Sequence, residues 1–252
     1  MRFVETVMGI PVSIDVRDGV DARPAAERAF QVMHEADRRF STYRPDSEVS
    51  RVNASLAQGA SMTLSADVRE VAAIGEAAAR ASGGAFRIRR ADGSWDLDGV
   101  VKGWAAARAA QELRAAGVRD FCLNAGGDVA VSGSPDAGRP WSVGIRSPNE
   151  PSAMLAVLRV TDVGVATSGA YERGAHIVDG RDGSPAAGLL SATVVADDLS
   201  TADVLATTVF ALGPDGVGHA LRSGARGVLA VDASGRILAA GDLRFARPVT
   251  TP

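Results

Sequence analysis

The feature that most constrains the fold is the order of helical and strand-like segments along the chain. Apolar residues recur at helical spacing within residues 21–43, 64–84 and 102–117, and consecutive strand-like segments then begin at residue 121. A doubly wound Rossmann sheet needs regular alternation of strand and helix, which is missing here. We therefore predict an α+β fold, a mixed α/β single domain that is not of the Rossmann type.

Turn residues and alternating patterns divide the rest of the chain. Residues 2–17 read as two strands broken at Met8-Gly9-Ile10-Pro11, and residues 41–54 read as a polar loop. Ser65 is the predicted N-cap of the second helix, which Gly83 and Gly84 end. Further strands are predicted at 121–133 (with a glycine turn), 141–148, 154–160, 163–169, 175–186 (running into a turn), 190–197, 227–233 and 236–241, with late helices at 199–212 and near 215–224.

Length and charge narrow the function classes. The chain has 252 residues without a fixed-period repeat or low-complexity linker, so we predict one domain over 1–252. Its 30 acidic and 27 basic residues predict no general affinity for nucleic acid or anionic membranes. Neither a signal-peptide core nor a membrane-spanning run is evident, so no membrane anchor and a cytoplasmic location are expected. The single Cys122 excludes an intramolecular disulfide.

The late helix "LSTADVLATTVFAL" carries three oxygen-bearing side chains, Ser200, Asp203 and Thr207, within one sector. The opposite side is apolar and suited to a core. One interpretation is structural: Ser200 and Asp203 form a capping box, and Thr207 bonds back to a carbonyl. The other is a site for a hard cation, because Mg²⁺ prefers carboxylate, hydroxyl and carbonyl oxygens and completes its shell with water or phosphate.

The segment "SWDLDGVVKGWA" is a second candidate. Asp96 and Asp98 lie just before Gly99, and Lys102 leads into a helix. A helix N-terminus preceded by glycine offers backbone amides to phosphate, and a lysine adds charge. A strand, a turn and an exposed lysine explain the same residues, since no full phosphate-binding loop motif surrounds them.

Two further stretches carry weaker signals. In "NAGGDVAVSG" two glycines before Asp128 allow close approach to a ligand, although a plain hairpin turn explains them equally well. In "ATSGAYERGAHIVDGRDGSP", Thr167 and Ser168 end a strand with donors, and His176 follows where the next strand begins. A lone histidine has a structural role more often than a catalytic one.

Taken in order, these segments resemble the FAD:protein FMN transferase family of the ApbE type. The resemblance runs from about Met8 to Gly213. It rests on nine short segments in the family's order: "MGIPVSI", "FSTYRPDSEVSRVN", "GGAF", "DLDGVVKGWA", "NAGGDV", "PWSVGIRSP", "VATSGAYER", "HIVDGRDGSP" and "ADVLATTVFALG".

The resemblance implies a mixed α/β fold of the ApbE-like type that holds FAD, as substrate, together with Mg²⁺. In such enzymes a threonine of an acceptor flavoprotein attacks the FMN-side phosphorus of FAD, FMN becomes attached through a phosphoester bond, and AMP leaves. The metal neutralises oxygen charge, and positioning does most of the remaining work.

The resemblance also assigns residues. Those matching FAD-binding positions are Met8, Tyr43, Ala85, Phe86, Arg87, Asp96, Lys102, Thr167, Ser168, Gly169 and His176. Those matching magnesium positions are Gly99, through its backbone carbonyl, Ser200, Asp203 and Thr207. Asp203 and His176 are the candidate catalytic residues, with His176 assisting proton transfer from the acceptor hydroxyl.

Three positions depart from the family pattern. Phe86-Arg87-Ile88 stands where Phe-Asp-Pro is common, Asp98 replaces a small residue, and Gly180 stands where proline is frequent. Arg87, with Arg89 and Arg90, would be able to hold a phosphate or an acidic partner. Two alternatives to a transferase therefore stay open: an FAD pyrophosphatase that gives FMN and AMP, and a non-catalytic flavin-binding protein.

Overall fold

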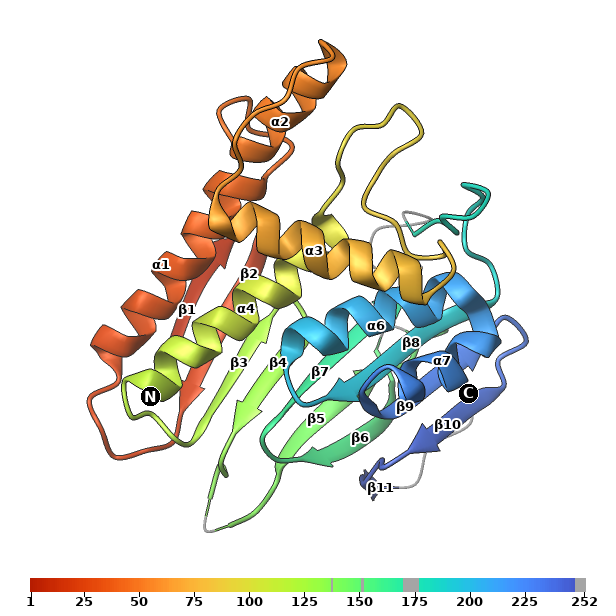
Figure 1. Cartoon of the computed structure of the whole chain (residues 1–252). Coiled ribbons are helices and arrows are strands. Elements are labelled where there is room, and N and C mark those ends of the chain that lie inside the picture. The colour runs from red at the N-terminus through yellow and green to blue at the C-terminus, as the bar shows by residue number, and fades with distance from the viewer. Residues whose placement is uncertain (137, 151, 170–176, 248–252) are drawn as a thin grey trace.

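A long antiparallel sheet forms the centre of the protein. The computed structural model describes residues 1–136, 138–150, 152–169 and 177–247. The sheet has eight strands in the order β1-β2-β3-β4-β7-β8-β9-β10, and every neighbouring pair is antiparallel (Figure 1). Its strands are β1 (Arg2–Val7), β2 (Ile10–Val16), β3 (Phe121–Ala125), β4 (Asp128–Ser132), β7 (Val163–Gly169), β8 (Leu189–Ala196), β9 (Ala225–Asp232) and β10 (Ile237–Gly241).

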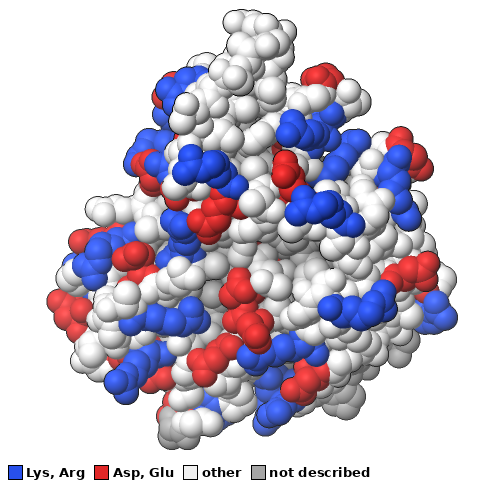
Figure 2. Space-filling model, viewed as in Figure 1, with Lys and Arg blue, Asp and Glu red and all other residues white. Residues whose placement is uncertain are grey.

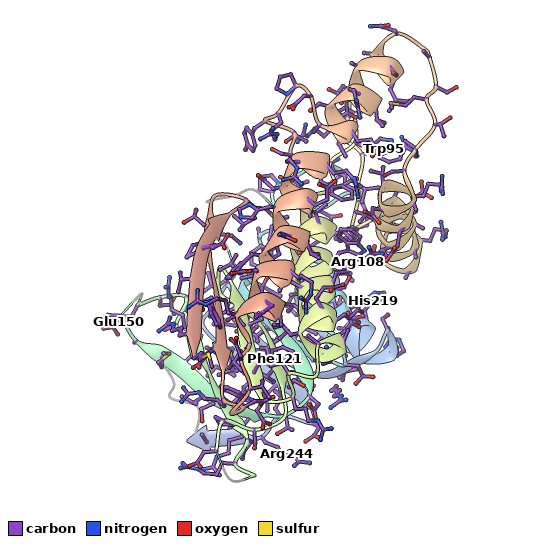
Figure 3. The ribbon with its side chains drawn as sticks, turned by 90° about the vertical axis from the view of Figure 1, so that its left-hand side faces the viewer. Trp95, Arg108, Phe121, Glu150, His219 and Arg244 are labelled. Carbon is purple, nitrogen blue, oxygen red and sulfur yellow. The ribbon has the colours of Figure 1, made fainter. Side chains whose placement is uncertain are left out.

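Helices cover one face of this sheet, and a smaller sheet covers part of the other. The helices are α1 (Arg23–Phe40), α2 (Glu48–Ala57), α3 (Ala66–Ala81), α4 (Asp98–Ala115), α6 (Leu199–Leu212), the short 3-10 turn η1 (Gly213–Asp215) and α7 (Gly216–Arg222). The smaller sheet has the order β11-β6-β5, from β5 (Trp141–Arg146), β6 (Met154–Val160) and β11 (Phe245–Arg247). In Figure 3, Glu150 of the β5–β6 loop and His219 of α7 lie on opposite sides of the molecule.

Three apolar clusters follow from this layering. The first joins α1, α4 and α6 to the helix-covered face of the long sheet, and its alanines allow close packing of the helices. The second lies among α2, α3 and the segment leading into α4, where Trp95 packs (Figure 3). The third fills the space between the two sheets. There Trp141, Val143 and Ile145 of β5 are buried while the residues between them are exposed, the alternation of a half-buried strand.

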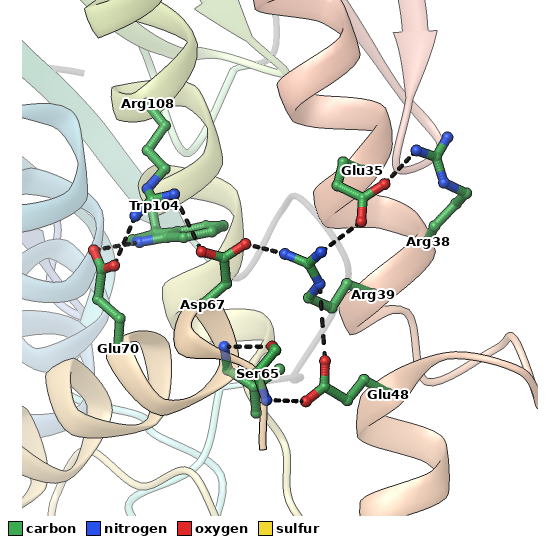
Figure 4. Close-up of polar contacts among 10 residues, drawn as sticks. Glu35, Arg38, Arg39, Glu48, Ser65, Asp67, Glu70, Trp104 and Arg108 are labelled. Atoms are coloured by element: carbon green, nitrogen blue, oxygen red, sulfur yellow. Dashed lines mark hydrogen bonds and ion pairs between the residues drawn. The ribbon is translucent and has the colours of Figure 1, made fainter. Parts of the chain in front are cut away.

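A polar network fastens α3 across α1 and α4 (Figure 4). The Arg39 guanidinium contacts Asp67 on α3 and donates 2.6 Å to Glu35 on its own helix. From α4, Arg108 donates to Asp67 and Glu70, at 3.2 and 2.7 Å, and lies over the Trp104 ring. These partly exposed pairs contribute little individually, but together they fix the direction of α3.

The predicted elements are largely confirmed. The strands at both ends of the chain, the first two helices and the late helices occur where the patterns placed them, and Ser65 caps α3 by accepting from the Val68 amide. Of the strand predicted at 175–186, only residues from 177 onward are described, and they form an isolated bridge between Val178 and Pro185.

Two predictions were wrong. Residues 41–54 are not all loop, because α2 begins at Glu48 after Ser47, whose hydroxyl accepts from the Ser50 amide at 3.0 Å. The helix predicted from Lys102 begins four residues earlier, at Asp98, because Val100 and Val101 are buried in the second apolar cluster. Gly99 and Lys102 therefore both lie in the first turns of α4.

The charged side chains are mixed over the surface in Figure 2, as the balanced composition suggests. On this face, basic and acidic side chains are interspersed, without a field of one sign. Among the residues the structure describes, no helix is long and apolar enough to cross a bilayer. The cytoplasmic location stays a prediction.

Candidate functional site

Most of the predicted site residues line one cavity of about 1650 Å³. It lies where the C-terminal end of α1, the segment 85–99, the start of α4, strands β3, β5 and β7, and helix α6 meet. The predicted residues that line it are Met8, Tyr43, Ala85, Phe86, Arg87, Asp96, Gly99, Lys102, Thr167, Ser168, Asp203 and Thr207. These residues come from six separate segments of the sequence and are brought to one place.

The contact between α4 and α6 fixes Asp203. The Gly103 amide donates a 2.8 Å hydrogen bond to Oδ2 of Asp203. A Cβ at Gly103 would lie only 2.5 Å from the Asp203 Cβ, so a glycine is required for this approach. Asp203 is 3% exposed, and Lys102 Nζ lies 3.8 Å from its Oδ1. The carboxylate is therefore held between the two helices. The helical pattern had instead predicted that Asp203 faces away from the core.

Thr207 lies one turn further along α6 and faces the end of β7. Its Oγ1 is 3.2 Å from Oγ of Ser168. A Cβ at Gly99 would lie 3.8 Å from Cγ2 of Thr207, which places the first turn of α4 beside the same threonine. Hydroxyl and carboxylate oxygens from α6 and β7 therefore converge at the N-terminal end of α4.

Asp128 is a site residue that the sequence pattern left undecided. Its side chain is buried, its Oδ2 is 2.6 Å from Lys102 Nζ, and its Oδ1 accepts a 3.0 Å hydrogen bond from the Thr167 amide. Asp128 thus holds both the ammonium of Lys102 and the end of β7. The only signal in the sequence was an aspartate directly after the Gly126-Gly127 turn.

Several groups around the cavity are suited to phosphate. In the first turn of α4 the Asp98 amide donates 3.3 Å to Oδ1 of Asp96 and the Val100 amide donates 2.9 Å to the Leu97 carbonyl, so Gly99 carries the amide of this turn that would meet an anion. Half-buried Arg87 lines the wall, and Arg90 pairs with Asp96 at 3.1 Å. Arg87, Arg90 and Lys102 thus bring three cationic groups to the cavity, of which Arg90 and Lys102 are paired with carboxylates.

Apolar groups complete the wall. Met8 adopts a φ of 55° in the β1–β2 turn, a conformation uncommon for residues other than glycine, and it borders the cavity. Phe86 is buried in the second apolar cluster, with only its edge at the cavity, whereas Tyr43 is 92% exposed at the rim. An exposed aromatic ring is suited to stacking on a flat ligand.

Cys122 also borders the cavity, on β3. Burial, reinforced by the charge of Asp15, raises the pKa of its thiol to about 11. The group is therefore a neutral thiol at physiological pH.

The oxygen donors around Asp203 fit a magnesium ion. The described residues contain no group of three or more His, Cys, Asp or Glu side chains arranged for a metal. Zinc and other ions that need such a group are poorly served by this donor set. One carboxylate and one hydroxyl agree instead with Mg²⁺, which uses one or two protein carboxylates with water and phosphate.

Of the predicted residues that the structure describes, two do not line this cavity. Ser200 lines a second cavity of about 630 Å³ among α3, α4, α6 and α7. Gly169 is buried at the end of β7 and does not line the main cavity. His176 lies outside the described residues. The capping interpretation of Ser200 was also wrong, because Asp198 is the N-cap of α6 and accepts from the Thr201 amide.

Comparison with known proteins shows the family of this chain. A family model described as the ApbE family matches residues 8–92 and 87–231, which together span most of the chain. The chain belongs to the ApbE family.

Curated relatives of this ApbE chain carry one name. It is 37% identical over 158 residues to a FAD:protein FMN transferase of Rhodobacter capsulatus, covering 59% of this chain and 30% of the relative. It is 32% identical over 131 residues to one of Haemophilus influenzae, covering 48% of this chain and 38% of the relative. These alignments span less than half the length of the relatives.

Solved structures show the same fold over nearly the whole chain. A flavin transferase ApbE from Vibrio cholerae superposes with a TM-score of 0.81 at 21% identity, covering 95% of this chain and 96% of that one. The ApbE protein of Thermotoga maritima gives 0.79 at 25% identity, covering 94% and 96%. The predicted α+β fold, distinct from a Rossmann sheet, is confirmed.

Proposed function

We propose that residues 1–252 form a single ApbE-like domain that transfers FMN from FAD to a threonine hydroxyl of an acceptor flavoprotein and releases AMP. The observation that carries the proposal is the position of Asp203. It lies at the bottom of a cavity large enough for a dinucleotide, beside Thr207 and the first turn of α4. Relatives named FAD:protein FMN transferase support the choice of FAD and of a protein acceptor.

The metal would be Mg²⁺, held by the carboxylate of Asp203, the hydroxyl of Thr207 and the backbone carbonyl of Gly99. When bound, it would neutralise charge on the phosphate oxygens of FAD. Ser200, which lines the other cavity, is not needed for this donor set. Because the Gly103 amide donates to Oδ2 of Asp203, the other carboxylate oxygen, Oδ1, is the one that faces Lys102 and the cavity.

The remaining residues bind and orient FAD. The Gly99 amide at the start of α4, with Lys102 and Arg87, would hold the diphosphate, and Asp128 pairs with the Lys102 ammonium at 2.6 Å and keeps it in position. Tyr43 and Met8 offer apolar surface to the flavin, and Asp96 and Thr167 polar contacts at the cavity wall. Gly169, at the end of β7, supports the strand that carries Thr167 and Ser168.

The reaction exchanges one phosphorus–oxygen bond for another. The threonine oxygen bonds to the FMN-side phosphorus, the bond from that phosphorus to the bridging oxygen breaks, and the electron pair leaves on AMP. The hydroxyl proton passes to a base, the role we propose for His176. An alignment of hydroxyl, phosphorus and leaving oxygen would supply much of the rate enhancement.

The test uses the whole protein with FAD and Mg²⁺, with and without candidate acceptors. A gain of the mass of FMN on a threonine and release of AMP support the transferase. Rapid AMP release without an acceptor identifies the pyrophosphatase, and tight FAD binding without cleavage identifies a flavin-binding protein. The variant D203N should abolish cleavage. The matched variant D198N lies outside the main cavity and should leave cleavage intact, because asparagine is as good a helix N-cap as aspartate.

A further inference from the structure

One strand of the smaller sheet presents a free edge to the main cavity. In the order β11-β6-β5, the described part of the chain pairs β5 with β6 alone. Residues 142–146 of β5 all line the cavity, one after another. A strand that showed only its face would contribute alternate residues, so a continuous run indicates that its edge is at the cavity.

The hydrogen-bond pattern shows which groups point outward. Ser142 pairs with Arg159 of β6, and the Arg159 amide donates 2.7 Å to the Arg244 carbonyl, away from β5. The Ser142–Arg159 pair is therefore a non-hydrogen-bonded one, in which the amide and carbonyl of Ser142 point away from β6. The register is regular from Trp141 to Ile145 and direction alternates along a strand, so the amide and carbonyl of Gly144 point the same way.

The surroundings of this edge leave room for a polypeptide. Ser142 and Gly144 are small, and Cys122 and Asn124 of β3 line the same cavity. Met154 is 60% exposed beside Gly144, where a Cβ would meet only the end of its flexible side chain. Exposed apolar side chains at a cavity, with an unpaired strand edge, are typical of a surface that another chain covers.

The size of the cavity also leaves room for a polypeptide. Pockets for a single small ligand usually measure about 300–1,000 Å³. The present cavity of about 1650 Å³ exceeds that range, so space remains beside one bound dinucleotide. The free edge of β5 borders that space, in the same cavity as Asp203 and Thr207.

We propose that the acceptor segment of the target protein binds in extended form as an added strand on the free edge of β5. Its main chain would pair with the outward amides and carbonyls of Ser142 and Gly144, and its threonine would reach toward Asp203. This inference rests on the proposed transferase function and names how its protein substrate is recognised. In this mode the main-chain hydrogen bonds give affinity, and contacts to alternate side chains of the added strand give specificity.

The first experiment identifies a probe. Synthetic peptides of about ten residues with a fixed central threonine, longer than a typical strand, are incubated with the full chain, FAD and Mg²⁺. The peptide that gains the mass of FMN fastest becomes the acceptor. If the protein neither binds nor cleaves FAD, the proposed function fails and this inference with it. If a whole acceptor flavoprotein gains FMN but no peptide does, only the strand inference is overturned.

The second experiment scans the acceptor peptide with single N-methyl groups. Pairing with β5 predicts that alternate positions lose about tenfold in kcat/KM while the positions between them do not, because alternate amides face the edge. This scan uses the unaltered enzyme and so does not depend on a variant's folding. A loss without alternation overturns the proposal.

The matched variants are Gly144→Pro and Gly144→Ala. Proline removes the outward amide, and prolines are tolerated at such edge positions. We expect G144P to lower the ratio of peptide modification to acceptor-free AMP release about tenfold, and G144A, which keeps the amide, to restore it to within about twofold. An unchanged ratio in G144P overturns the proposal. If G144P also converts a dimer to a monomer while the ratio is unchanged, the proposal is overturned and a second copy of this chain is the partner of the β5 edge.

Discussion

The amide of Gly103 on α4 donates a 2.8 Å hydrogen bond to the carboxylate of Asp203 on α6, and no side chain separates the two helices at this point. The contact buries Asp203 and fixes its direction. It also makes the site dependent on a residue that has no functional group of its own.

Gly103→Ala should therefore damage the site. The added Cβ would lie 2.5 Å from the Asp203 Cβ and 2.9 Å from the Leu199 carbonyl, neither of which can move freely. Overpacking of this kind costs about 1–3 kcal/mol, which outweighs the gain of about 1 kcal/mol from alanine in a helix. We expect a lower free energy of unfolding, measured with urea, and a large loss of Mg²⁺-dependent FAD cleavage.

The control for this variant is Gly218→Ala on α7. A Cβ there would meet only the end of the flexible Arg222 side chain, at 3.3 Å. We expect G218A to be as stable as the wild type or up to about 1 kcal/mol more stable, with normal activity. Equal behaviour of G103A and G218A would show that the α4–α6 contact does not position Asp203.

Thr207→Val tests the hydroxyl ligand at nearly constant shape. Loss of the oxygen should weaken Mg²⁺ binding at least about tenfold, measured by direct titration of the ion and by the Mg²⁺ dependence of FAD cleavage. Thr208→Val is the matched control, because its hydroxyl donates 2.7 Å to the Val204 carbonyl, away from the main cavity. An equal effect of both variants on Mg²⁺ affinity would rule out Thr207 as a ligand.

The sequence was most informative where the determinants are local. The cap at Ser65 marked the start of α3, and the absence of alternating strands and helices excluded a Rossmann sheet. It was least informative where contacts join distant elements. The pairing of Lys102 with Asp128 depends on α4 lying over β4, which no local pattern encodes. Likewise, the strand patterns of β5 and β6 do not say which strands they pair with, so their separate sheet was not predictable.

Helical spacing alone does not place Ser200 relative to the main cavity. At about 100° per residue, Ser200 and Thr207 lie within about 20° of each other, on the same side of Asp203, but about 10 Å apart along the axis of α6. Helix α4 crosses α6 at Gly103, beside Asp203 and between these two positions, and Thr207 lines the main cavity while Ser200 lines the second one. The division could be seen only with the position of α4 known.

Asp232 should contribute to stability against acid. A hydrogen bond from the Ser234 hydroxyl, with others from Arg236, lowers the pKa of this carboxyl from 3.8 to about 2. A depressed folded-state pKa means that its stabilisation is fully present above the unfolded value and is lost as the pH falls through about 2. The difference in unfolding free energy between the wild type and D232N should therefore shrink between about pH 4 and pH 2.

Ser234→Ala removes the largest cause of that shift. Urea unfolding of S234A across the same range should show a weaker acid dependence than the wild type. If D232N and the wild type differ by a constant amount from pH 5 to about pH 2, the carboxyl does not titrate as the hydrogen bonds require.

Cys122 offers a measurement on the cavity itself, since it is the one cysteine of the chain and borders the proposed strand-binding edge. Burial raises the pKa of its thiol to about 11, and only the thiolate reacts with iodoacetamide. The alkylation rate of the folded protein should therefore keep rising with pH beyond 9. In urea it should level off near the ordinary value of 9.0, because burial is lost. A rate for the folded protein that already levels off at pH 9 would show that the thiol is not buried beneath β5.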